Sequence, residues 1–267
     1  MSVPDMPKGR PGRTRVRLRF SKLGKVRFTS HRDIARIWER ALRRAELPVA
    51  YSEGFSPRPR VSFGLALPTG HEGLGEYLDV ELAGNPDEDR RLDRLAERLD
   101  PCLPVGFRVG GAGLVEPGAP SVQQAVVSCR WRMELLGVGA DRAVETIAAA
   151  LASSILVVER LRKGELVTDD IRPDIDHLAL VGPTPAGVEV EAELTAQPRV
   201  LRPGELAGLF GADAREGRTC RTHQFALDAH GAKVEPLPAP AGLIGWSIAA
   251  PSPSPVSGSA PLPAGAS

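Results

Sequence analysis

The chain has 267 residues, 42% of them hydrophobic, which is enough to bury the core of one large domain or two small ones; we expect two. No apolar run approaches the roughly 20 residues that a membrane span requires, and the N-terminal residues lack the apolar stretch of a secretory signal, so we expect a cytoplasmic protein. Cys102, Cys129 and Cys220 are too few and too far apart for a disulfide framework or a CxxC-type metal cluster.

Charge is distributed unevenly along the chain. Residues 1–60 hold 16 Lys and Arg against 5 Asp and Glu, whereas the remaining residues hold 18 against 28. A basic region of this density is typical of proteins that bind phosphate-bearing partners. The alternative is that the two oppositely charged parts of the chain dock on one another.

The first half begins with an expected flexible basic arm, residues 1–12. Apolar residues then alternate with Arg15, Arg17 and Arg19, which predicts a strand over residues 14–20 with the three arginines on an exposed sheet surface. A turn around Gly24 and a short extension follow. The remaining predicted elements are a helix over 30–45, strands over 49–51, 61–67 and 76–82, a helix over 86–99 and a strand over 107–115.

The helix expected after Ser30 has the clearest signature in the chain. Ser30 and Asp33 have the spacing of a capping box, and Pro48 ends the helix. Its apolar residues recur at helical spacing and its arginines fall largely on the other faces. The apolar set is Ile34, Ile37, Trp38, Ala41, Leu42 and Ala45, and the basic set is Arg32, Arg36, Arg40, Arg43 and Arg44.

A break at residues 116–121 separates this half from a second one of similar element order. We expect strands over 125–136, 155–159, 177–181, 187–194 and 222–228, helices over 140–154 and 202–210, and a polar loop over 163–176. The predicted fold class is therefore α+β, with two tandem ferredoxin-like (βαββαβ) halves. The expected domains are residues 13–116 and 122–235, followed by a disordered Pro/Ala/Ser-rich tail, 236–267, in which the apolar run LIGWSI is able to dock.

The motif FSKLGKVRFTSHRDIARIWERALRRAELPVAYSEGFSPRPRVSFGLALPTG, followed by GEYLDVEL, resembles a bacterial family of unknown function that is associated with radical SAM proteins. The resemblance extends over about residues 13–228 and is sharpest between Ser30 and Gly70. It implies that this chain is the stand-alone form of a domain found elsewhere fused behind a radical SAM protein. The iron–sulfur cluster and S-adenosylmethionine would then belong to the partner, and no cofactor to this chain.

The basic helix and the loop SEGFSPRPR are the expected contact surface for RNA or another anion. Aromatic rings interleaved with guanidinium groups suit base stacking and phosphate contact, and prolines stiffen the loop. The alternative is a rigid hairpin connection with solvated arginines. The candidate residues are Arg32, Arg36, Arg40, Arg43, Arg44, Tyr51, Ser52, Phe55, Ser56, Arg58 and Arg60.

Two further groups of residues are weaker candidates. His31 and Tyr51 have side chains suited to metal-independent acid–base chemistry, although His31 equally fits a polar first-turn position. His71, Glu72 and Glu76 are expected to complete a site opposite the loop arginines. In the second half, Arg199, Arg202, Arg218 and Arg221 either extend a basic groove or lie on the surface.

Recognised catalytic and metal-binding motifs are missing from the sequence: it contains no P-loop, GxGxxG, GxSxG, HxH or HxxxH. Three hypotheses remain. The preferred one is a non-catalytic subunit that presents tRNA or rRNA to a radical SAM partner. The alternatives are an RNA-processing endonuclease-like protein, by fold analogy alone, and a scaffold that docks on the radical SAM protein without RNA.

Overall fold

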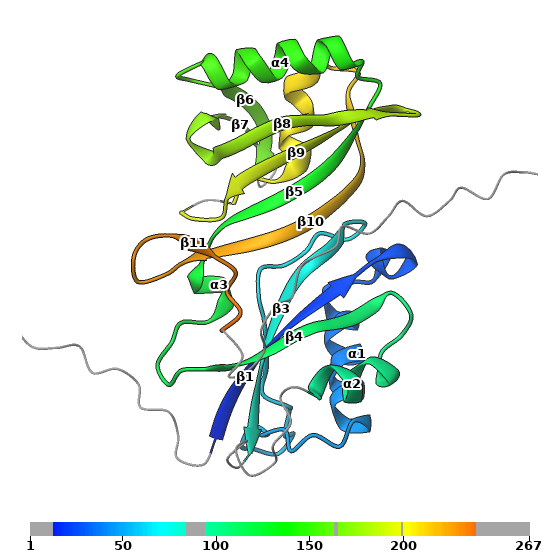
Figure 1. Cartoon of the computed structure of the whole chain (residues 1–267), viewed down its shortest axis with the longest axis vertical. Coiled ribbons are helices and arrows are strands. Elements are labelled where there is room, and N and C mark those ends of the chain that lie inside the picture. The colour runs from blue at the N-terminus through cyan, green and yellow to red at the C-terminus, as the bar shows by residue number, and fades with distance from the viewer. Residues whose placement is uncertain (1–12, 84–93, 163–164, 199, 239–267) are drawn as a thin grey trace, which may run out of the picture.

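The computed structural model describes residues 13–83, 94–162, 165–198 and 200–238 (Figure 1). The expected basic arm, the start of the helix predicted over 86–99, and the LIGWSI run lie outside these residues. Within them the protein is a mixed α+β molecule with a large, mostly antiparallel sheet and few helices.

Among the described residues, the first half contains four strands and two α-helices, in the order strand, helix, strand, strand, helix, strand. The strand expected over 49–51 is reduced to isolated bridges at Val49 and Tyr51. Two 3₁₀ turns accompany the helices and strands, Gly24–Phe28, where a short extension was expected, and Asp100–Cys102. The elements are β1 (Arg13–Lys22), α1 (His31–Arg44), β2 (Val61–Phe63), β3 (Glu72–Ala83), α2 (Leu95–Leu99) and β4 (Phe107–Val115).

The second half is richer in strands. Its elements are α3 (Val122–Ala125), β5 (Val126–Leu136), α4 (Ala140–Ala152), β6 (Val157–Arg162), β7 (Glu165–Asp170), β8 (Ile175–Thr184), β9 (Gly187–Thr195), α5 (Pro203–Ala207), β10 (Arg215–Leu227) and β11 (Lys233–Val234). The polar loop expected over 163–176 is wrong in part, because β7 pairs with β6 in a separate two-stranded hairpin.

One continuous sheet joins the two halves. Its order is β4-β1-β3-β10-β5-β9-β8, with β2 added on β3 and β11 on β10. The neighbours are antiparallel except at the junction, where β3 and β10 run parallel through Glu72 with Cys220 and Gly73 with Arg221. At Gly75 a Cβ atom would lie 2.9 Å from the Thr222 carbonyl oxygen, so a glycine permits this close approach.

Two hydrophobic clusters lie along this sheet. In the first half, Ile34, Trp38 and Leu42 of α1 pack on the apolar side of β1 and β3. The second-half cluster centres on β5, β9 and α4 and reaches back to Tyr77 of β3. The predicted cap of α1 is confirmed, since the Ser30 hydroxyl accepts a hydrogen bond from the Asp33 amide at 3.2 Å.

The predicted arginine surface on β1 is wrong, because its other face is covered. Arg17 is 5% exposed; it donates two hydrogen bonds to Asp79 and one to the Pro236 carbonyl oxygen. Arg19 lies 3.4 Å from Glu235. We call residues 235–238, which cross this face, the C-terminal strap. The first three residues of the expected disordered tail are therefore packed on the sheet.

Candidate functional site

The outer face of α1 carries a row of exposed arginines, which we call the arginine stripe: Arg32, Arg36, Arg40, Arg43 and Arg44. Arg32, Arg36 and Arg40 follow one another at intervals of four residues, and Arg43 and Arg44 lie three and four residues beyond Arg40. All five therefore share one side of the helix, opposite the buried Ile34 and Trp38. Arg36 lies 3.4 Å from Asp33, and Arg40 donates to the Arg36 carbonyl oxygen. The other three form no ion pair with a carboxylate of the described residues. The stripe is thus a concentration of largely uncompensated positive charge.

The SEGFSPRPR loop is closed by its own backbone. The Ser52 amide donates to the Arg58 carbonyl oxygen at 2.9 Å, and the Arg58 amide donates to the Ser52 hydroxyl at 3.0 Å. This closure leaves Phe55, Ser56 and Arg58 exposed, with Phe55 fully in solvent. Arg60 differs, since it lies half-buried 3.7 Å from Glu81. Ser52 therefore has a structural role, and the loop carries an exposed aromatic ring three residues before an exposed arginine.

The pair of residues considered for acid–base chemistry is not brought together. The His31 ring packs edge-on against Phe63, with centroids 5.3 Å apart. Tyr51 lies beyond the other end of α1, where it forms an isolated bridge with Pro59. Within the described parts of the chain, no hydrogen bond or ring contact links the two side chains, so the geometry gives no support to the endonuclease-like alternative.

Glu72 and Glu76 do not face the loop arginines as expected. Glu72 is buried, accepts hydrogen bonds from Arg218 and the Gly24 amide at 2.7 Å each, and lies 3.7 Å from Arg27. Glu76 is paired with the buried Arg221. Both carboxylates serve the junction between the halves. Of this predicted group, His71 lines the cavity that is described next.

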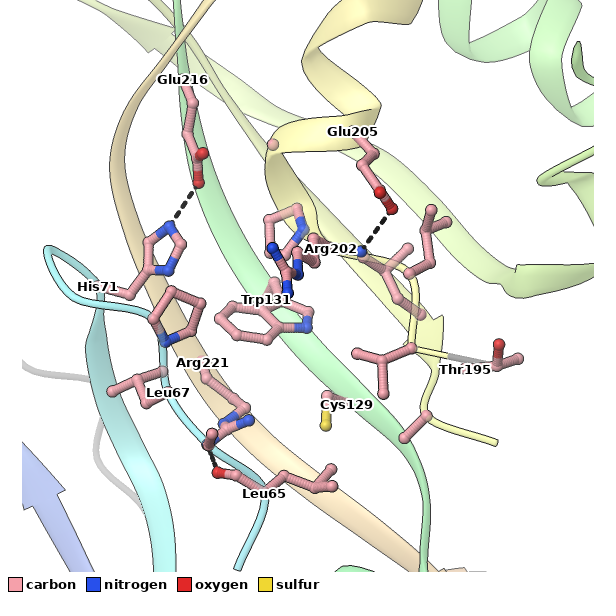
Figure 2. A pocket seen from close by; sticks show the side chains of 18 of the residues that line it. Leu65, Leu67, His71, Cys129, Trp131, Thr195, Arg202, Glu205, Glu216 and Arg221 are labelled. Atoms are coloured by element: carbon pink, nitrogen blue, oxygen red, sulfur yellow. Dashed lines mark hydrogen bonds and ion pairs between the residues drawn. The ribbon is translucent and has the colours of Figure 1, made fainter. Parts of the chain in front are cut away.

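That cavity lies at the junction and has a volume of about 1070 Å³. Figure 2 shows the segment from Leu65 to His71 on one side and the segment from Thr195 to Glu205 on the other, with β5 and β10 between them. We call this cavity the junction pocket. Its walls are mainly apolar, formed by Leu65, Leu67, Pro68, Val200, Leu201 and Pro203.

A histidine–carboxylate pair lies at one end of the junction pocket. His71 Nε2 is 2.7 Å from Glu216 Oε1, and the Thr219 hydroxyl donates to the same oxygen at 2.7 Å (Figure 2). Burial acts to raise the pKa of Glu216, but the hydrogen bonds from His71 and Thr219 outweigh it and lower that pKa. The carboxylate is therefore ionised, and His71 Nε2 carries the proton that it accepts.

Trp131, Arg221 and Cys129 form the inner part of the pocket. Arg221 is 2% exposed, donates to Glu76 and to the Leu65 carbonyl oxygen, and places its guanidinium carbon 5.3 Å from the Trp131 ring centre. Burial raises the pKa of the Cys129 thiol to about 11, so the thiol is neutral at pH 7. Trp131 is 4% exposed and its indole nitrogen has no hydrogen-bond partner in the described structure.

Most of these pocket residues were missed from the sequence. Arg221 was expected in a groove or on the surface, yet it is buried. Arg218 is largely exposed and pairs with Glu72. Arg199 lies outside the described residues. β10 is mostly polar and its few apolar residues do not alternate with the polar ones, so its sequence gave no signal that Arg221 is buried. Nothing in the sequence indicated its contact with β3.

The described residues contain neither a group of side chains placed to bind a metal nor a helix able to span a membrane. No group of three or more His, Cys, Asp or Glu side chains is placed to hold a metal ion there. None of the described helices is long and apolar enough to cross a bilayer.

These features define an α+β protein with an exposed arginine stripe and a half-open junction pocket. A family model described as "Uncharacterized protein conserved in bacteria" (DUF2344) matches residues 15–203, and the chain belongs to this family. The solved structures include a similar chain from the "Crystal Structure of a Cbf5-Nop10-Gar1 Complex", with a TM-score of 0.43 and 13% identity. The match covers 84% of this chain and 55% of that one. No curated protein matches.

Proposed function

We propose that the protein binds RNA through the arginine stripe and the SEGFSPRPR loop, and that it presents this RNA, tRNA or rRNA, to a radical SAM partner in the cytoplasm. The observation that carries the RNA proposal is the stripe itself. Its five arginines are exposed on one helix face, and among the described residues only Arg36 forms an ion pair with a carboxylate. Such a surface gains affinity by neutralising phosphates and releasing their counterions.

The SEGFSPRPR loop adds the second element of single-strand recognition. Phe55 is fully exposed at the loop tip, and Arg58 follows it closely. A ring that is fully exposed, with no ring contact to the described residues, is available for stacking on a base, and stacking contributes about 1–3 kcal/mol per base. The closed backbone holds the ring and the guanidinium in place, which reduces the entropy lost on binding.

The fold that we infer for both halves is ferredoxin-like. In the first half, strand order β4-β1-β3-β2 with α1 and α2 between strands supports this inference. In the second half, β10-β5-β9-β8 supports it in the same way if the β6–β7 hairpin is an insertion. β10, the edge strand of the second half, would then join the first half at the start of β3, before the stretch of β3 that pairs with β2.

The loop's role is tested with bulk tRNA and a single-stranded oligouridylate in filter-binding assays. The double variant Phe55→Ala/Arg58→Gln should bind at least about tenfold more weakly, because it loses one stacking ring and one phosphate contact. Val181→Ala/Arg132→Gln is the matched control, since it removes an exposed apolar residue and an exposed arginine from the second half. Equal affinity of all three proteins would refute the loop's role.

The partnership with a radical SAM protein rests on the resemblance of the Ser30–Gly70 motif. In this proposal the partner carries the iron–sulfur cluster and S-adenosylmethionine, and the present chain contributes RNA binding. Tagged protein purified under anaerobic conditions, with and without nuclease, should retain a radical SAM chain identified by mass spectrometry. Recovery only without nuclease indicates an RNA bridge, recovery in both indicates direct docking, and recovery in neither contradicts the partnership.

A further inference from the structure

A second exposed aromatic ring lies at the end of α1 opposite the SEGFSPRPR loop. Phe28 ends the 3₁₀ turn Gly24–Phe28, three residues before α1 begins at His31. It is 61% exposed and belongs to neither of the two hydrophobic clusters formed by the described residues. A single exposed apolar side chain is ordinary on a protein surface. Phe28 differs from that case in two respects, its rigid support and its basic surroundings.

The support of Phe28 is the guanidinium group of Arg27, whose Cζ atom lies 4.6 Å from the ring centre. The same guanidinium lies 3.7 Å from the carboxylate of Glu72, which is itself buried. The Arg27 carbonyl oxygen accepts hydrogen bonds from the Gly70 amide at 2.8 Å and from Lys22 Nζ at 3.0 Å. Both ends of Arg27 are therefore held, and its cation–π contact restrains the ring. Because the guanidinium covers one face of the ring and most of the residue stays exposed, the opposite face is open to solvent.

The surroundings of Phe28 carry positive charge. Lys25 is exposed in the same turn, and no carboxylate of the described residues forms an ion pair with it. Arg32, the first residue of the arginine stripe, follows Phe28 by four residues, which span about 14 Å at most. The ring thus lies close to the N-terminal end of the stripe.

These surroundings favour a nucleobase over a protein as the partner of the open ring face. The cores of protein–protein interfaces are depleted of charged residues, whereas Phe28 lies among Lys25, Arg27 and Arg32. Single-stranded nucleic acid suits this combination, because a base stacks on the ring while cations nearby bind the phosphates on either side. The Arg27 guanidinium behind the ring adds a cation–π contribution to such a stack.

We propose that Phe28 is a second base-stacking site and that one single RNA strand runs along α1 between Phe28 and the loop ring, Phe55. One base stacks on the open face of Phe28, opposite Arg27, and the arginine stripe binds the phosphates in between. This inference rests on the proposed function and extends it from an RNA-binding surface to a defined strand path. The 14 residues of α1 extend over about 21 Å, a length that roughly six nucleotides cover at a rise of about 3.4 Å each.

Binding of a labelled dodecauridylate, measured by fluorescence anisotropy, tests the stacking site. Phe28→Leu retains an apolar side chain but removes the aromatic face, so it should weaken binding at least about fivefold. Phe28→Tyr retains the ring and should keep the affinity of the unmodified protein. Val144→Ala, at a 54% exposed apolar position on α4 of the second half, is the control and should not change the affinity. Unchanged affinity of Phe28→Leu, or an equal loss in Phe28→Tyr, would overturn the proposal.

Photochemical crosslinking locates the bound bases. A dodecauridylate that carries 5-iodouridine reacts on irradiation with aromatic rings on which a base is stacked, and mass spectrometry of the digested protein identifies those rings. Crosslinks should occur at both Phe28 and Phe55 in the unmodified protein, and the crosslink at Phe55 should persist in Phe28→Leu. A crosslink at Phe55 alone in the unmodified protein would overturn the second stacking site.

The triple stripe variant Arg36→Gln/Arg40→Gln/Arg43→Gln distinguishes this inference from the proposed function. If it loses affinity for the dodecauridylate while Phe28→Leu does not, RNA binding through the stripe stands and the strand path is wrong. If neither variant loses affinity, the proposed function fails and this inference fails with it. If Phe28→Leu keeps its RNA affinity but no longer retains a radical SAM chain after nuclease treatment, Phe28 is a protein-docking residue, which also overturns the inference.

Discussion

Arg221 of β10 reaches across the parallel β3–β10 junction to Glu76 of β3, and the two side chains form an ion pair that is almost completely buried. Burial alone would lower the pKa of Arg221, but the Glu76 carboxylate raises it, so the arginine is charged. Removing one partner of a buried pair leaves the other charge without compensation. The junction between the halves therefore depends on this contact.

Replacement of Glu76 by Gln should destabilise the protein by about 3–5 kcal/mol, because Arg221 keeps its charge and loses its counterion. Urea denaturation measures this difference. Glu81→Gln is the matched control: Glu81 is partly exposed and lies 3.6–3.7 Å from Arg13 and Arg60, so its loss should cost less than about 1 kcal/mol. Similar costs for the two variants would show that the junction does not depend on the buried pair.

The C-terminal strap lies directly on β4. A Cβ atom at Gly113 would be 2.5 Å from the Pro238 carbonyl oxygen, so Gly113→Val should displace the strap and cost about 1–3 kcal/mol. Hydrogen exchange of residues 233–238 should accelerate in this variant. At Gly110 the nearest atom would be 3.4 Å away, and Gly110→Ala should leave the exchange unchanged. Unaltered protection in Gly113→Val would mean that the strap does not pack there.

The Glu216 carboxylate predicts a specific pH dependence of stability. Its folded-state pKa is lowered from the ordinary value of 4.5, so the unfolded state binds more protons in the interval between the two values. The stabilisation is therefore fully present above pH 4.5 and is lost as the pH falls through the folded-state pKa. Unfolding free energies measured from neutral to acidic pH should fall less steeply for Glu216→Gln than for the unmodified protein. For Glu97→Gln, at an exposed position on α2, the free energy of unfolding should fall with decreasing pH as steeply as it does for the unmodified protein. Identical slopes for Glu216→Gln and the unmodified protein would contradict the assignment.

Ser30 should contribute about 1 kcal/mol to stability through the N-cap of α1. Ser30→Ala removes the acceptor of the Asp33 amide and should lower the free energy of unfolding by that amount. Ser62, which is exposed in β2, gives the comparison variant Ser62→Ala, for which we expect almost no change. If Ser30→Ala leaves the free energy of unfolding unchanged, the N-cap does not contribute, and α1 is stabilised by its packing on the sheet alone.

Local sequence patterns predicted the elements but not their tertiary partners. The capping spacing and apolar periodicity of α1 and the alternation of β4 depend on neighbouring residues, and both elements occur at the predicted positions. The alternation in β1 correctly separated an apolar face from an arginine face, but it did not indicate which residues cover the arginine face. Arg17 is buried by Asp79 and Pro236, which are 62 and 219 residues away in the chain.

The junction pocket shows the same limit. His71 was among the candidates, but Glu216, its partner, lies 145 residues further along the chain. Trp131 and Arg221 meet only because β5 and β10 pair in a register in which these two residues are opposite one another. Periodicity assigns each side chain to a face, and only the sheet order determines which faces meet.

The most direct test of RNA binding is the salt dependence of affinity for a single-stranded oligouridylate between about 50 and 200 mM salt. The triple variant Arg36→Gln/Arg40→Gln/Arg43→Gln is compared with Arg132→Gln/Arg142→Gln/Arg215→Gln. The comparison variant removes three arginines from the second half, of which Arg132 and Arg215 are exposed and Arg142 is half-buried. Each lost phosphate contact should lower the slope of log affinity against log salt by about 0.7, hence by about 2 for the stripe variant and not for the control. Equal slopes for both variants and the unmodified protein would contradict RNA binding through the stripe.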